Sequence, residues 1–208
     1  MMLLSTQAGR APASGYVPQP GYDDPVAGAQ SAFRAALHAL AHPGTPVRTA
    51  PPRGVPPGLS PAMTALLLTL ADADTPLWLP PGTDRATLGY LRFHCASPMA
   101  DDPAEARFVA VPAGAAPPPL AACRQGEPAY PDRSATLLLE VQSLTAGRAV
   151  TLRGPGIAAR APLAAAGLPG DFWRQWRDNH GRFPLGVDVL LTCGDQLCGL
   201  PRTTLVEE

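Results

Sequence analysis

The sequence predicts an α/β fold, specifically a three-layer α/β/α sandwich around a mixed sheet. Two mainly apolar segments, 136–141 (TLLLEV) and 185–192, are typical of strands that are buried on both faces. They alternate with segments of helical spacing, which favours a sheet covered by helices over an all-β fold. The turn Gly194-Asp195 joins the last two strands as a hairpin, so the sheet is expected to contain antiparallel as well as parallel pairs.

The first predicted helix spans residues 25–41. Asp24 can cap it, Pro25 suits its first position, and Gly44 supplies a stop. Its larger apolar residues approximate helical spacing, so we expect them to form the buried face while Arg34 points away. These residues are Val26, Phe33, Leu37 and Leu40.

The second helix begins with the same signal, a cap followed by proline. Ser60 and Pro61 precede the segment 62–71 (AMTALLLTLA), which is apolar on nearly every side, so this helix should lie at the centre of the fold.

The remaining elements alternate between short strands and helices. Strands are expected at 75–80, 92–95, 107–111, 136–141, 149–153, 185–192 and 197–200, and helices at 84–91, 117–123 and from 170–171 through Trp176. Gly154-Pro155-Gly156 must form a turn.

Length and composition indicate one domain. The chain has 208 residues, 46% hydrophobic and 16% charged, with a net charge of −1. Residues 1–22 are rich in turn formers and lack periodicity, which predicts a flexible N-terminal extension before a single domain at 23–208. The charge gives no broad argument for nucleic acid as a partner, and no segment resembles a secretion signal or a membrane span. Four irregularly spaced cysteines fit a reducing cytoplasm.

All sixteen basic residues are arginines, and this excludes specific chemistry. Without lysine the chain cannot anchor pyridoxal phosphate through an internal aldimine, and it cannot build a standard P-loop. We therefore expect no cofactor of the pyridoxal phosphate type.

The histidines and cysteines give no strong metal or nucleophile pattern. His38 and His42 could share a metal, but the glutamate and further ligands of zinc proteases are missing, which favours a structural role and no metal site. His94 and Cys95 are adjacent in the predicted strand and would point to opposite faces, which argues against a dyad. Cys193 and Cys198 flank the hairpin turn and are expected to be buried free thiols.

Three arginines could contact a ligand. Arg92 and His94 share strand parity and could enter one cleft. Arg153 and Arg202, with the turn Gly154-Pro155-Gly156, could offer donors to phosphate or phosphonate oxygens. The alternative is ion pairing with local acids.

The order of segments resembles the PhnH family, a subunit of the bacterial carbon-phosphorus lyase system. Three blocks carry the resemblance: DPV-x-x-AQ-x-x-FR at 24–34, LLTLAD-x-DTP at 67–76 and FPLG-x-D-x-LLTCG at 183–194. The resemblance covers about residues 22–206, and it does not extend to the N-terminal extension or to the proline-rich stretch 113–119.

The resemblance implies a fold similar to the large domain of pyridoxal-phosphate-dependent transferases, without that cofactor. It also implies a homodimer when isolated and assembly with the PhnG, PhnI and PhnJ subunits. That assembly forms a ribose phosphonate triphosphate by displacing adenine from ATP with a phosphonate. Cleavage of the carbon-phosphorus bond is then implied to belong to a radical-SAM partner, since this chain has no cysteine cluster for it.

Three hypotheses follow. The leading one is an accessory subunit without independent activity and with no identified catalytic residue. The second is a cleft that binds nucleotide or phosphonate through Arg92, His94, Asp188 and Arg202. The third is a structural homodimer outside any complex.

Overall fold

The computed structural model describes residues 19–207, and its central element is a six-stranded mixed sheet of order β1-β8-β7-β4-β3-β2. The parallel strands are β2 (Leu77–Trp78), β3 (Phe108–Val111), β4 (Thr136–Glu140) and β7 (Asp188–Cys193). The antiparallel pairs add β8 (Gln196–Leu200) beside β7 and β1 (Val47–Arg48) beside β8. The register pairs Cys193 with Gln196, so the predicted Gly194-Asp195 hairpin is confirmed.

A second sheet of three antiparallel strands covers part of one face. It consists of β6 (Ala161–Leu163), β5 (Val150–Arg153) and β9 (Leu205–Glu207) in that order. The strand predicted at 149–153 is therefore confirmed, but it belongs to this smaller sheet.

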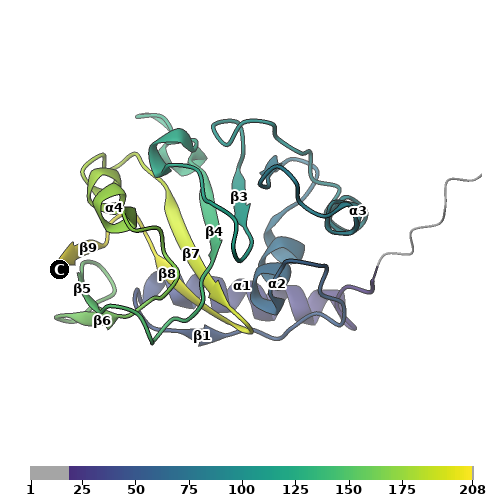
Figure 1. The fold of residues 1–208 in the computed structure, drawn as a ribbon, viewed down its shortest axis with the longest axis horizontal. Helices are drawn as coiled ribbons and strands as arrows, with labels where there is room; N and C mark the ends of the chain where they lie inside the picture. The colour runs from purple at the N-terminus through teal and green to yellow at the C-terminus, as the bar shows by residue number, and fades with distance from the viewer. Residues whose placement is uncertain (1–18, 208) are drawn as a thin grey trace, which may run out of the picture.

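Four α-helices complete the described part of the chain: α1 (Pro25–Ala41), α2 (Pro61–Leu70), α3 (Arg85–Cys95) and α4 (Phe172–His180). In the view of Figure 1, α1 and α2 lie behind the large sheet and α4 lies in front, beside the small sheet. An α/β fold with a mixed sheet is thus confirmed. One outer layer is helical, and the other combines α4 with the small sheet.

Alternate side chains along the central strands point to opposite faces of the sheet and pack in two separate cores. Leu138 of β4 and Leu190 of β7 pack in the core under α1, α2 and α3. Leu137 and Val189 pack on the opposite face, in the core that contains Trp176 of α4. Both faces of these strands are covered, which explains why their central residues are apolar without alternation.

The buried face of α1 is not the predicted one. The buried residues are four alanines, Ala32, Ala35, Ala36 and Ala39, whereas Val26, Phe33 and Leu37 are 67%, 46% and 52% exposed. The cause is the short distance between α1 and β8, because a Cβ on Gly199 would lie 2.4 Å from the carbonyl oxygen of Ala39. Only small side chains fit between helix and strand, so Val26, Phe33 and Leu37 lie on the outer side of α1, while Leu40 is partly buried and packs against the core as predicted.

The strand predicted at 92–95 is also wrong, because these residues form the last turn of α3. Asp84 caps this helix by accepting a hydrogen bond from the Ala86 backbone N–H at 2.7 Å. Its buried residues Thr87, Leu91 and Cys95 recur every four positions, which is the spacing of a helix face.

Two further boundaries differ from the prediction. The short helix expected at 117–123 is a single 3-10 turn over Leu120–Ala122. The last long strand begins at Asp188, whereas the sequence indicated 185.

Most of the predicted N-terminal extension lies outside the described residues. Its last four residues run along α2 and α3: the Gln19 carbonyl lies 2.9 Å from His94 Nε2, and the Tyr22 hydroxyl donates to the Ala65 carbonyl at 3.0 Å. Within residues 19–207, no helix has both the length and the apolar character needed to cross a membrane.

Candidate functional site

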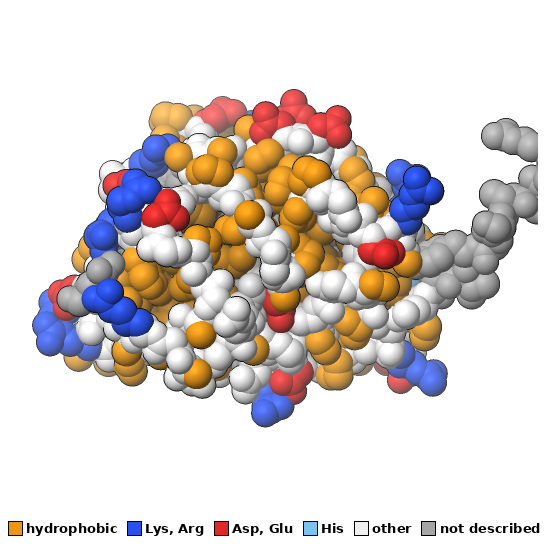
Figure 2. Space-filling view, viewed as in Figure 1, with side chains coloured by type: hydrophobic (Ala, Val, Ile, Leu, Met, Phe, Trp, Pro, Cys, Tyr) orange, Lys and Arg blue, Asp and Glu red, His pale blue; other side chains and the backbone are white. Residues whose placement is uncertain are grey.

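Two adjoining cavities, of about 270 and 450 Å³, lie between the segment 113–125 and α4. We call them together the α4 groove. Pro119, Asp171 and Gln175 line both cavities, and the larger one reaches Glu140 and Gln142 at the carboxyl end of β4. Ligands of open α/β sheets bind at the carboxyl ends of the strands. Figure 2 shows hydrophobic side chains around a hollow in this face of the molecule and basic side chains on the rim at the α4 side.

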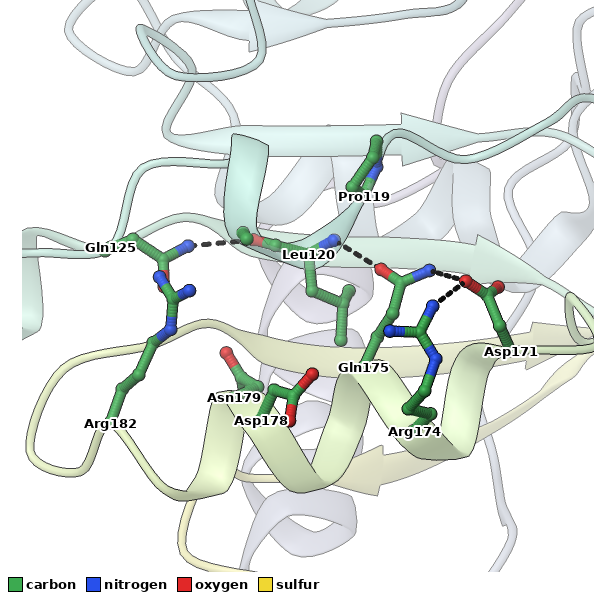
Figure 3. A pocket seen from close by; sticks show the side chains of 10 residues that line it. Pro119, Leu120, Gln125, Asp171, Arg174, Gln175, Asp178, Asn179 and Arg182 are labelled. Atoms are coloured by element: carbon green, nitrogen blue, oxygen red, sulfur yellow. Dashed lines mark hydrogen bonds and ion pairs between the residues drawn. The ribbon is translucent and has the colours of Figure 1, made fainter.

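Hydrogen bonds fix the α4 wall of the groove (Figure 3). Gln175 donates to the Asp171 carboxylate at 3.0 Å and accepts from the Leu120 backbone N–H at 2.9 Å. Arg174 donates to the same carboxylate at 2.9 Å. Gln125 donates to the Leu120 carbonyl at 2.8 Å. The polar side chains of this wall are therefore held in place by partners from both sides of the groove.

The charged side chains of the groove are distributed differently in its two cavities. Arg174 and Arg182 lie in the smaller cavity, together with Asp171 and Asp178. The larger cavity has no basic side chain among its lining residues, and there Glu140 accepts a hydrogen bond from the Thr192 hydroxyl at 2.5 Å. An anionic group would be favoured only beside the two arginines, and an uncharged polar group fits the rest.

Sequence reasoning missed this groove. The family resemblance does not extend to the segment 113–119, and the sequence predicts only a helix from 170–171 through Trp176, whose Phe172 and Trp176 pack in the core. The signal that could have found the groove is Asp171, Arg174 and Gln175 at helical spacing on the polar side of that helix.

Arg92 and His94 do not enter one cleft together. In α3, residues two positions apart point to different sides of the helix, so the parity argument for a strand fails. Arg92 is exposed. The His94 ring lies 4.4 Å from the Tyr90 ring and contacts Gln19 through Nε2, so it holds the N-terminal segment against α3.

Asp188 and Arg202 do meet, and they contact mainly each other. Arg202 donates to both carboxylate oxygens, from Nε at 3.1 Å and from Nη2 at 2.5 Å. The remaining donors of its guanidinium contact the carbonyls of Pro131 and Pro184 and the Ser134 hydroxyl. The pair lies beside the end of α4, since the His180 ring contacts the Arg202 carbonyl at 2.9 Å, and Figure 1 places α3 at the opposite end of the molecule.

Three of the four free thiols are deeply buried. Desolvation by burial raises the pKa of Cys95 and Cys198 to about 11 and that of Cys123 to about 12. These groups are therefore neutral thiols at physiological pH and poor nucleophiles. Cys193 is partly exposed, and burial again raises its pKa. In the part of the chain that is described, no three His, Cys, Asp or Glu side chains are grouped to hold a metal ion.

The buried thiols predict a loss of stability at alkaline pH. A thiol whose pKa is raised on folding stabilises the protein fully below the unfolded pKa, near 9, and that contribution is lost as the pH rises toward the folded value near 11. Without lysine, the side chains that titrate in this window are the thiols and the tyrosines. We expect the free energy of unfolding, measured with urea, to fall between pH 9 and 11. Replacing Cys198 by alanine should make the fall shallower, and an unchanged slope would contradict the prediction.

Comparisons with known proteins identify relatives over nearly the whole chain. Residues 20–207 match the family described as bacterial phosphonate metabolism protein (PhnH). The chain is 38% identical over 187 residues to the alpha-D-ribose 1-methylphosphonate 5-triphosphate synthase subunit PhnH of Rhizobium meliloti (strain 1021), covering 89% of this chain and 94% of that protein. A putative C-P lyase subunit protein, HtxG of Stutzerimonas stutzeri, is 36% identical over 81 residues, which are 39% of this chain and 42% of that protein.

Proposed function

Because the chain belongs to the PhnH family of bacterial phosphonate metabolism proteins, we propose that it is an essential accessory subunit of a carbon-phosphorus lyase complex. Its role is to support the formation of ribose 1-phosphonate 5-triphosphate from ATP and a phosphonate, with displacement of adenine, and the later cleavage of the carbon-phosphorus bond. The transferase and lyase activities belong to the assembly.

The observation that carries this proposal is the match to a synthase subunit along almost the full length of both proteins. The side chains support an accessory role. Arg202 and Asp188 are occupied by internal contacts, and the thiols of Cys95, Cys123 and Cys198 are kept protonated by burial.

The proposed partners are the PhnG, PhnI and PhnJ subunits in the cytoplasm, and a second copy of the chain when the protein is isolated. Pyridoxal phosphate does not fit, because the sequence contains no lysine to bind it. A likeness to the large domain of the transferases that use this cofactor stays a prediction.

The test is co-purification of the tagged full chain with the three partner subunits, followed by phosphonate turnover with and without it. We expect a stable complex whose turnover is lost when this chain is left out. Failure to co-purify, or full turnover without the chain, would overturn the proposal.

The second candidate is a direct contribution to ligand binding, which the α4 groove favours by its volume and by its place at the carboxyl end of β4. In the same turnover assay, replacing Arg174 and Arg182 together by alanine should then raise the KM for ATP or phosphonate while the complex still assembles. The matched control replaces Arg48 and Arg53, which are exposed and lie outside the groove. An unchanged KM would contradict ligand binding by the groove, and the accessory role would be the only one of the two to remain.

A further inference from the structure

A third cavity continues the α4 groove toward the edge of the large sheet. It has a volume of about 230 Å³ and is lined by the loop 80–84 after β2, by Pro57 and Gly58, and by Pro112 after β3. It shares Ala115 with the larger cavity of the α4 groove, which reaches the end of β4. The three cavities therefore form a row along the carboxyl ends of the neighbouring parallel strands β2, β3 and β4. We call this row the carboxyl-edge groove.

The third cavity and the larger cavity of the α4 groove are apolar and poor in donors. Four prolines line the first and three line the second, and a proline contributes an apolar ring but no backbone N–H. No arginine is among the lining residues of either cavity. A phosphate group placed there would meet neither a positive charge nor a row of N–H donors. The prolines are Pro57, Pro80, Pro81, Pro112, Pro117, Pro119 and Pro169.

Glu140 adds a carboxylate without a cationic partner to this apolar lining. The residue ends β4 and is partly buried. Its Oε2 accepts from the Thr192 hydroxyl at 2.5 Å, whereas its Oε1 has no hydrogen-bond or ion-pair partner within residues 19–207. Two other acids of the row are already occupied, since Asp84 caps α3 and Asp171 pairs with Arg174. Oε1 of Glu140 is therefore left to accept from a group that enters the cavity.

We propose that the carboxyl-edge groove binds an extended segment of a partner polypeptide, which places a lysine or arginine side chain on Glu140. The inference rests on the proposed accessory function, and it gives the α4 groove a different occupant from the small ligand of the second candidate. Side chains on one face of an extended chain recur about every 6.6 Å, comparable with the spacing of roughly 5 Å between neighbouring strands. Alternate side chains of the segment can therefore enter successive cavities, which is how pockets recognise extended peptides.

The chemistry of the larger cavity selects a basic side chain. A lysine or arginine combines a cationic end with an aliphatic stem. The end would pair with Glu140, and the stem would contact Leu168, Pro117 and Pro169 of the same lining. The surrounding rings exclude water from the pair, which strengthens the attraction between its charges. An acidic segment or a triphosphate would instead bring its charge next to an unpaired carboxylate.

The first test uses the isolated full chain and overlapping synthetic peptides that cover the sequences of PhnG, PhnI and PhnJ. We expect at least one peptide to bind, and we expect binding to be lost when its lysine or arginine is replaced by glutamine. In Glu140→Gln the Kd of that peptide, measured by fluorescence anisotropy, should rise at least about tenfold. The matched control is Glu127→Gln, since Glu127 is exposed and lines none of the three cavities. Absence of a binding peptide, or equal Kd values for the two variants, would overturn the proposal.

A second test examines the groove in the assembled complex. Ala116 is exposed and lines the larger cavity, so a photo-cross-linking amino acid at this position reports what occupies it. We expect a covalent link to a lysine- or arginine-containing segment of another subunit. We also expect Ala116→Trp, which fills the cavity, to weaken peptide binding at least about tenfold, while Ala159→Trp at an exposed position outside the groove leaves it unchanged. A link to a second copy of this chain, or no link in the assembled complex, would refute the inference.

These outcomes separate the inference from the proposed function. If the complex assembles and turns over phosphonate but no peptide binds, the inference fails and the accessory role stands. If a peptide binds through Glu140 while turnover is complete without this chain, the accessory role fails and the inference stands. If ATP or a phosphonate binds the isolated chain, Ala116→Trp blocks that binding and no peptide binds, the groove is the ligand site of the second candidate and the inference is overturned.

Discussion

Replacing Arg202 by alanine is expected to lower the free energy of unfolding by about 3 kcal/mol, because it leaves Asp188 as an unpaired, largely buried carboxylate. The side chains of Arg202 and Asp188 are only 11% and 25% exposed. The same substitution removes donors from the carbonyls of Pro131 and Pro184 and from the Ser134 hydroxyl. The guanidinium therefore joins three separate segments around the start of β7, and its loss loosens all of them.

The measurement is urea or thermal unfolding of the isolated chain, where 3 kcal/mol corresponds to a fall in Tm of about 6–12 °C for a chain of this size. The matched control is Arg174→Ala. Arg174 and Asp171 form an ion pair whose side chains are 65% and 48% exposed, so its loss should cost less than about 1 kcal/mol. Similar losses for the two variants would show that Arg202 is an ordinary surface residue.

The fold was predictable where one local signal dominated. Asp24 with Pro25 and Ser60 with Pro61 predicted the starts of α1 and α2, and the structure confirms both caps. The apolar run of β4 predicted a strand buried on both faces, because burial on both faces removes the alternation of apolar and polar residues. These features depend on neighbouring residues, so they can be read from a single sequence.

The prediction failed where a distant residue decides the outcome. Leu37 looks like a core residue until Gly199, more than 150 positions away, brings β8 against the alanines of α1. The α4 groove is equally non-local, since Gln175 meets the backbone of Leu120 only in the folded chain. Asp188 and Arg202 were predicted as possible ligand contacts, and periodicity could not show that they bind each other.

The glycine at position 199 gives the sharpest test of how α1 is held. We expect Gly199→Val to lower the free energy of unfolding by at least about 3 kcal/mol, because its side chain would meet backbone atoms that cannot rotate away. A Cβ there would lie 2.4 Å from the oxygen of Ala39 and 2.7 Å from the nitrogen of Leu40. Helix α1 must then move outward from β8, which opens the core beneath Ala35 and Ala39.

Strand propensity alone predicts that Gly199→Val raises the free energy of unfolding, the opposite of the effect expected from packing. The experiment therefore distinguishes the two. Position 199 lies inside β8, where valine is a better strand former than glycine and should stabilise the protein if contacts with α1 were loose. The control is Gly170→Ala, since a Cβ at Gly170 has nothing within 4 Å and its effect should be small. A stable Gly199→Val variant would mean that α1 can stand away from the sheet. In that case the exposure of Phe33 and Leu37 would need another cause than the close approach of helix and strand.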